Sequence, residues 1–242
     1  TSLYNVAVGF ETGQAITTGI RNTLIGAFAG DTLTTGGNNI AIGLNALTTE
    51  DTGSFNVAIG SEALNTQNAG TDAYNVAAGH QAGKAVTTGV QNTLIGGIAG
   101  DALTDADFNV VVGRGALTTD TLGSRTVAVG YEALGAQNFT TATDSYNTAV
   151  GFQAGAGLTT AITNTLVGSF AGAGAVTGNG NTLIGYASGY NTVTITSGNS
   201  NTCIGGNTHP SAADGVSQVV LGTNTTGGGN NTVRIGGLVG HA

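Results

Sequence analysis

The stretch Asn22-Thr23-Leu24-Ile25-Gly26 decides the fold, because its pattern recurs along almost the whole chain. The pattern is Asn, then Val or Thr, then Ala or Leu, then Ile or Val, then Gly. Fourteen units end at Gly9, Gly26, Gly43, Gly60, Gly79, Gly96, Gly113, Gly130, Gly151, Gly168, Gly185, Gly205, Gly222 and Gly236. Nine of the thirteen steps between them are 17 residues long, and the others are 19, 21, 20 and 14. Such self-similarity is the signature of a repeat architecture.

The units themselves follow a longer repeat. Tyr4-Asn5-Val6-Ala7-Val8-Gly9 returns after 70 residues at 74–79 and after a further 72 at 146–151, so four units form one block. The residue four after the unit glycine distinguishes the units within a block. It is Gly13, Gly30, Leu47 and Leu64 in the first block and Gly83, Gly100, Leu117 and Leu134 in the second. This pattern indicates duplication of a four-unit block.

A 17-residue period predicts an all-β parallel β-solenoid of about 14 rungs, with a 70 to 72 residue super-repeat. Helical repeats and leucine-rich repeats need longer units. Each unit contains a short apolar segment that ends at a glycine, which is typical of a strand followed by an unusual backbone conformation. Parallel stacking at about 4.8 Å per strand predicts a rod roughly 60 Å long. We expect regular repeats over 1–205 and irregular C-terminal rungs with a cap over 206–242.

Alternation along the strand separates two apolar columns. The residue before each glycine is aliphatic in every unit except at Ala78, and we expect this column to form the solenoid core. The residue two before the glycine is mostly Ala or Leu, as at Ala58 and Ala128, and becomes Arg234 in the last unit. A monomer would need this second face to be polar. We therefore predict that it is buried against other copies of the chain in a side-by-side homotrimer.

Asparagine begins eleven of the fourteen units. A stacked column of asparagines predicts a structural ladder, in which side-chain amides hydrogen-bond from rung to rung. The members are Asn5, Asn22, Asn39, Asn56, Asn75, Asn92, Asn109, Asn147, Asn164, Asn181 and Asn201.

Composition excludes several classes of protein. Only 7% of the 242 residues are charged, the net charge is −8, and 43 residues are glycine. A single cysteine rules out a disulfide scaffold, and the glycines do not follow the three-residue period of collagen. The scarcity of Lys and Arg argues against nucleic acid as a partner, and no apolar run is long enough for a membrane-spanning helix.

The Asn-Thr-Leu-Ile-Gly units at 22–26, 92–96 and 181–185, together with Asn56-Val-Ala-Ile-Gly-Ser-Glu-Ala-Leu64, resemble the repeats of phage tail fibres and tail spikes. They are also similar to the head repeats of trimeric autotransporter adhesins. The resemblance implies a left-handed parallel β-roll of three chains that serves in attachment to a host. It places the chain on a virion surface, or alternatively on a bacterial cell surface, with other virion or surface proteins at its ends. The 17-residue spacing favours the phage group, in which a C-terminal chaperone often cuts itself away; the chain ends at Ala242 just after the last unit.

Aromatic residues are candidate contact residues. One group precedes the asparagine column and includes Tyr74 and Phe108; the other follows the unit glycine and consists of Phe10, Tyr131, Phe152 and Tyr186. Because aromatic residues are enriched at interfaces, we expect these rings to seal the seams between chains; binding of the sugar rings of a host glycan is the alternative. The variable loops near 65–73, 135–145 and 190–200 are a further place for receptor contact.

The sequence predicts no catalytic residue, no metal site and no cofactor, and hence a non-enzymatic protein. His80 replaces an aromatic residue at a surface position, and Cys203 replaces Leu or Ala in a small-residue column, where a thiol is a buried apolar group. Asp101, Asp105 and Asp107 form the densest acidic cluster; a solvated loop is the default interpretation and Ca²⁺ binding the alternative. Threonine pairs such as Thr17-Thr18 raise ice binding as another function, but they skip rungs and are irregularly placed.

Overall fold

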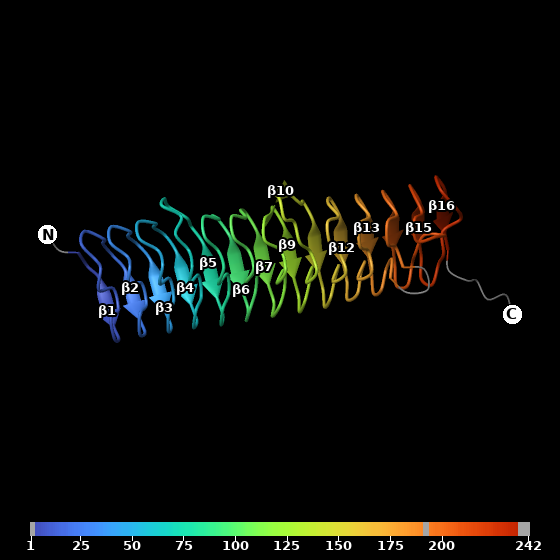
Figure 1. The fold of residues 1–242 in the computed structure, drawn as a ribbon. Coiled ribbons are helices and arrows are strands. Elements are labelled where there is room, and N and C mark those ends of the chain that lie inside the picture. The colour runs from blue at the N-terminus through green and yellow to red at the C-terminus, as the bar shows by residue number, and fades with distance from the viewer. Residues whose placement is uncertain (1–2, 191–193, 237–242) are drawn as a thin grey trace.

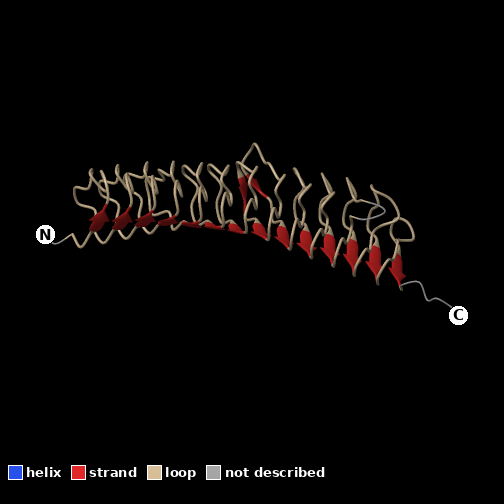
Figure 2. Cartoon of the chain, turned by 90° about the horizontal axis from the view of Figure 1, so that it is seen from below, coloured by secondary structure: helices blue, strands red, loops and turns tan. Residues whose placement is uncertain are grey.

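The computed structural model describes residues 3–190 and 194–236 and shows a parallel β-solenoid of about thirteen turns (Figure 1). Its fourteen-stranded sheet follows the order of the chain, because each turn contributes one strand. The strands of this sheet are β1 (Val6–Val8), β2 (Thr23–Ile25), β3 (Ile40–Ile42), β4 (Val57–Ile59), β5 (Val76–Ala78), β6 (Thr93–Ile95), β7 (Val110–Val112), β9 (Val127–Val129), β11 (Thr148–Val150), β12 (Thr165–Val167), β13 (Thr182–Ile184), β14 (Thr202–Ile204), β15 (Val219–Leu221) and β16 (Val233–Ile235). The strands lie along one side of the rod and the loops along the other (Figure 2).

The register of the sheet matches the sequence repeat residue for residue. Leu24 pairs with Ala41, and Ala41 pairs with Ala58. The longer steps keep the register as well: Ala58 pairs with Ala77 across the 19-residue step. The extra residues leave the coil as loops, and beside one of them β8 (Gly123–Ser124) and β10 (Thr143–Asp144) form a small parallel sheet. The main sheet also continues beyond residue 205 through β15 and β16.

The prediction of which strand face forms the core is wrong. The middle residue of each strand points into the solenoid and is fully buried from Leu24 to Val220, whereas Ile25 and Ile59 before the glycines are exposed. Both columns are apolar, so alternation alone could not determine which one faces inward. The interior of a 17-residue coil is narrow, and it takes the small Ala-rich column, while the bulkier β-branched column lies outside. Ala58 and Ala128 are therefore core residues of a single chain and not contact residues between chains.

The four-turn block has its physical origin in how this core is filled. Leu24 points into the coil between Gly13 and Gly30, and a Cβ atom at either glycine would lie 2.7 Å or 3.0 Å from the leucine methyl groups. In the third and fourth turns, where the middle strand residues are Ala41 and Ala58, the residues four after the glycine are the buried Leu47 and Leu64. Large and small residues thus alternate between two walls of the coil, so that the interior is filled without overlap.

The unit glycine permits the close stacking of turns. At Gly26 φ is +129°, and an added Cβ would lie 2.5 Å from the carbonyl oxygen of Gly43 in the next turn. Glycine is required here for both reasons. Other corners of the coil use the left-handed helical conformation with residues that carry side chains, such as Gln91 at φ +57° and Phe108 at φ +60°. Tertiary stacking overrides the local preference of these residues.

Candidate functional surfaces

The outer face of the fourteen-stranded sheet is an apolar surface that runs along the whole rod. We call it the sheet face; it consists of the first and third residue of each main-sheet strand. Ile59, Ile95 and Ile204 are each about 40% exposed on it. At about 4.8 Å per strand and a width of about 10 Å, its area is on the order of 600 Å², the upper end of what monomeric proteins expose. The two end strands of the sheet, β1 and β16, are exposed at all three of their residues.

Aromatic residues border the sheet face along both long edges. The group before the asparagine column contains Tyr4, Phe55, Tyr74, Phe108 and Tyr146, all of them exposed. Within this edge, Phe55 and Tyr74 stack with ring centroids 5.0 Å apart. The guanidinium of Arg125 lies 4.9 Å from the Phe108 ring and forms an ion pair with Asp144. This edge is thus a row of rings interrupted by polar side chains.

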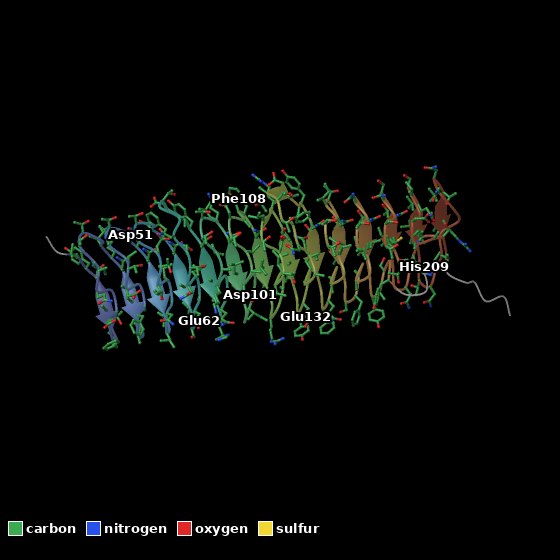
Figure 3. The ribbon with its side chains drawn as sticks, viewed as in Figure 1. Asp51, Glu62, Asp101, Phe108, Glu132 and His209 are labelled. Carbon is green, nitrogen blue, oxygen red and sulfur yellow. The ribbon has the colours of Figure 1, made fainter. Side chains whose placement is uncertain are left out.

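The second group of aromatics lies at the other edge. The four predicted residues Phe10, Tyr131, Phe152 and Tyr186 are all exposed. The structure brings three of them together: Tyr131 stacks on Phe152 at 5.3 Å, and Phe170 contacts both Phe152 at 5.3 Å and Tyr186 at 6.0 Å. Phe10 is distant from these and contacts Phe28 at 5.5 Å. Figure 3 labels Glu62 and Glu132 on this edge, and Asp51 and Phe108 on the opposite one.

The asparagine column lies inside the coil. The expected amide-to-amide contact occurs from Asn164 to Asn147 at 3.3 Å and from Asn201 to Asn181 at 3.1 Å, but most hydrogen bonds of the column join a side chain to the backbone. The backbone N–H of Asn39 donates to Oδ1 of Asn22 at 2.9 Å, and Nδ2 of Asn22 donates to the carbonyl of Gly36 at 2.9 Å. The same oxygen contact recurs along the column, for example from the N–H of Asn92 to Asn75 Oδ1 at 2.8 Å. Each side chain therefore satisfies backbone groups at a corner where no strand partner is present. All eleven asparagines are placed in this one column, with Asn5 half-buried at the end and the others buried.

Two buried carboxylates are structural residues that the sequence analysis missed. Glu50 Oε1 accepts a hydrogen bond from the N–H of Gly53 at 2.7 Å, and its Oε2 accepts one from Gln67 Nε2 at 2.9 Å. Gln67 in turn accepts from Nδ2 of Asn75 at 3.0 Å. The N–H of Ala69 in the inserted loop also donates to Glu50, at 3.3 Å. The carboxylate thereby anchors the base of the loop at 65–73.

The second block repeats this arrangement. Asp120 Oδ1 accepts from the N–H groups of Gly123 at 3.1 Å and Phe139 at 2.9 Å, and its Oδ2 accepts from Gln137 Nε2 at 2.6 Å. Gln137 accepts from Asn147 Nδ2 at 2.9 Å. The loop at 135–145 is thus held like its counterpart. The signal available in the sequence was the recurrence of an acidic residue followed 17 residues later by glutamine, just before each insertion.

The acidic cluster is occupied by contacts within the chain. Asp101 accepts a hydrogen bond from Thr118 at 2.6 Å, Asp105 from Thr88 at 2.6 Å, and Asp107 from the N–H of Val90 at 2.8 Å. Among residues 3–190 and 194–236, no group of three or more His, Cys, Asp or Glu side chains is arranged to hold a metal ion. Each aspartate instead joins one turn to a neighbouring turn.

The remaining candidates lie apart from one another. His80 is exposed on the edge that carries Tyr131, and Cys203 is fully buried at the centre of β14. Burial raises the pKa of the Cys203 thiol to about 12. A thiol of this kind is not a ready nucleophile at neutral pH. The third variable loop, near 190–200, lies partly outside the described residues.

The described residues include no helix with the length and hydropathy that a membrane span requires. No protein-family model, curated protein or solved structure matches the chain.

Proposed function

We propose that the chain is a structural, non-enzymatic rod: a segment of a phage tail fibre or tail spike that contributes to attachment at the host surface, built from three copies side by side. The observation that supports this proposal is the sheet face, on which the third strand residue is apolar in every turn and which aromatic residues border. A soluble rod with such a face gains free energy when the face is removed from water.

The sheet face also fits a second copy of the chain in its dimensions. A standard stable interface buries roughly 800 Å² on each partner, and the sheet face together with its aromatic edges is of this order. Aromatic residues at the border and few charges at the centre are typical of interfaces. Three copies about one axis would cover each face and leave the loops outside.

Light scattering of the purified chain at micromolar concentration tests the assembly. The proposal expects a mass three times the 23.5 kDa of one chain. A particle of 23.5 kDa would overturn it. An antibody raised against the chain, used to label virions for electron microscopy, tests the location: labelled tail fibres or spikes support the phage assignment.

Labelling of a bacterial surface would instead favour the alternative, the head of a trimeric adhesin, which uses the same kind of rod. Ice binding is a third candidate function. Six strands begin with an outward threonine, and those of β11 to β14 form one aligned row, Thr148, Thr165, Thr182 and Thr202. The row is single and covers only these four turns, because Val or Ile takes the same position in the other strands except β2 and β6. Thermal hysteresis in a solution of the purified chain would favour ice binding over attachment.

A further inference from the structure

A hollow of about 300 Å³ lies on the outer wall of the second block, next to the edge that carries Tyr131. We call it the block-two hollow. Charged and hydroxyl side chains line it, namely Arg114, Thr118, Thr119 and Glu132. Its floor and remaining walls are small or aliphatic: Ile98, Gly115, Gly135, Ala136 and Ala156. A volume of this size is at the lower end of the range for small-molecule sites.

The first block shows what the same place looks like when it is filled. Counted from the unit glycines, Asn45, Asn65 and Thr66 of the first block, with Lys84 in the turn that follows it, correspond to Gly115, Gly135 and Ala136 of the second block, with Ala156 in the turn that follows it. In the first block Asn65 Nδ2 donates to the carbonyl of Asn45 at 3.1 Å. Lys84 reaches back to Glu62 and forms an ion pair at 2.6 Å. All four larger side chains are replaced by Gly or Ala around the hollow, which is the space that they would occupy.

The charged groups of the hollow differ correspondingly. Glu132 is the counterpart of Glu62 and keeps the same glutamine contact, from Gln153 Nε2 at 2.8 Å, but the lysine is replaced by Ala156. Hydrogen bonds from Gln153 and Tyr131, with a smaller contribution from the charge of Arg114, lower the pKa of Glu132, which favours its ionised form. Arg114 stands where the first block has Leu44, and its guanidinium contacts the Tyr131 ring at 5.9 Å. Neither charge has an ion-pair partner within 4.0 Å among the described residues.

We propose that the block-two hollow binds one ring of a saccharide. Sugar hydroxyls need donors and acceptors close together. The hollow offers the guanidinium of Arg114 as donor and the carboxylate of Glu132 as acceptor. The hydroxyl oxygens of Thr118 and Thr119 are further acceptors, since their protons are donated to Asp101 and to the carbonyl of Gly135. The ring of Tyr131, which follows the hollow's strand and contacts the Arg114 guanidinium, adds an aromatic edge near the rim. One cation and one anion at the same rim disfavour a strongly charged ligand. The inference rests on the proposed role in attachment, to which it adds the class of ligand and its position.

Saturation-transfer NMR tests the inference with glucose, galactose, N-acetylglucosamine and N-acetylneuraminic acid at millimolar concentration. We expect at least one of these sugars to receive saturation from the wild-type chain. The filled variant carries Gly115→Asn, Gly135→Asn, Ala136→Thr and Ala156→Lys, which copies the first block. It should weaken binding at least tenfold. It should also fold, because Gly115 has φ +65°, close to the φ of +55° at Asn45, and because an added Cβ there would meet no atom closer than 3.5 Å.

Arg114→Leu, a single change that also copies the first block, should weaken the same binding without altering the shape of the coil. The matched control is Asn45→Gly with Asn65→Gly, which changes equivalent positions in the first block and should leave sugar binding within twofold of wild type. Failure of all four sugars to bind the wild-type chain would overturn the inference, and so would unchanged binding by the filled variant. The mass of the assembly is independent of these readouts, so a trimer that binds no sugar would refute the hollow as a saccharide site and leave the rod proposal intact.

Discussion

Leu94 occupies the space that Gly83 leaves open in the preceding turn: a Cβ atom at Gly83 would lie 2.6 Å from Cδ1 of Leu94. Leu94→Ala is expected to lower the free energy of unfolding by about 3 kcal/mol, because it removes a fully buried side chain and leaves a cavity. Chemical denaturation followed by circular dichroism measures this loss.

A double-mutant cycle tests the pairing itself. Gly83→Ala should be clearly less destabilising in the Leu94→Ala background than in the wild type, because the closest contact of the new methyl group, 2.6 Å from Leu94 Cδ1, is then gone and the nearest remaining atom is Leu64 Cδ2 at 3.0 Å. The backbone strain of an alanine at φ +59° is the same in both backgrounds, so it cancels in the comparison. Strictly additive costs would show that Gly83 and Leu94 do not compete for one space.

Asn92→Ala should be strongly destabilising, by about 2–5 kcal/mol. The change removes the acceptor for the N–H of Asn109, 3.0 Å away, and the donor to the carbonyl of Ala106, 2.7 Å away, and both backbone groups lie in the interior. Chemical denaturation provides the measurement, and Gln91→Ala at the exposed neighbouring position is the control, with an expected change below about 0.5 kcal/mol. Equal effects of the two substitutions would contradict the role of the column.

Gln91 tests the cost of the left-handed corners. Its φ is +57°, and Asn38 holds the same corner of another turn at the same angle. Gln91→Asn should raise the free energy of unfolding by roughly 0.5 kcal/mol, because asparagine tolerates this conformation, whereas the β-branched residue in Gln91→Val should lower it by about 1 kcal/mol or more. Thermal unfolding of the two variants gives the order. A valine variant as stable as the asparagine variant would show that the corner is not strained.

Ile95→Lys places a charge on the sheet face and is expected to prevent assembly, because a lysine there would be buried without a partner in the trimer. Val176→Lys is the matched control: Val176 is 39% exposed and Ile95 40%, but Val176 lies in a loop away from the sheet. Light scattering should report the single-chain mass for the first variant and the wild-type mass for the second. Assembly of Ile95→Lys at the wild-type mass would remove the sheet face as the contact surface.

The buried thiol of Cys203 should make the stability of the fold depend on pH in the alkaline range. Its thiol pKa is raised by burial from 9.0 to about 12, so the folded state disfavours the thiolate. The resulting stabilisation is complete below pH 9 and decreases as the pH rises from about 9 towards 12. The wild type should therefore lose more stability over this range than Cys203→Ala, as denaturation at pH 8 and pH 10.5 would show. Rapid reaction of the native thiol with a disulfide reagent at pH 8 would contradict its burial.

The sequence predicted the architecture because the strand pattern and its period are local properties. Asn22-Thr23-Leu24-Ile25-Gly26 contains the strand, the corner glycine and the spacing that stacks one turn on the next. It could not predict whether Leu24 or Ile25 faces inward, since both are apolar and the choice depends on the width of the coil. That width follows from packing against Gly13 and Gly30, which belong to other parts of the coil.

The same limit applies to the surfaces. The two aromatic groups were visible in the sequence, but their arrangement on opposite edges of one sheet required the strand face to be known. Glu50 and Asp120 resembled ordinary loop charges, because their burial depends on hydrogen bonds from Gln67 and Gln137 in the following turn. The block-two hollow is evident only when equivalent positions of two blocks are compared in three dimensions.

The filling of the core also gives the rod a natural unit of length. A turn that brought leucine to the place of Gly30 would overlap Leu24, because a Cβ there already lies 3.0 Å from the Leu24 methyl group. Adding or removing a complete block of four turns keeps each leucine beside its glycine at both junctions. Lineages that lengthen or shorten this rod should therefore do so in steps of about 19 Å, four strand spacings at a time.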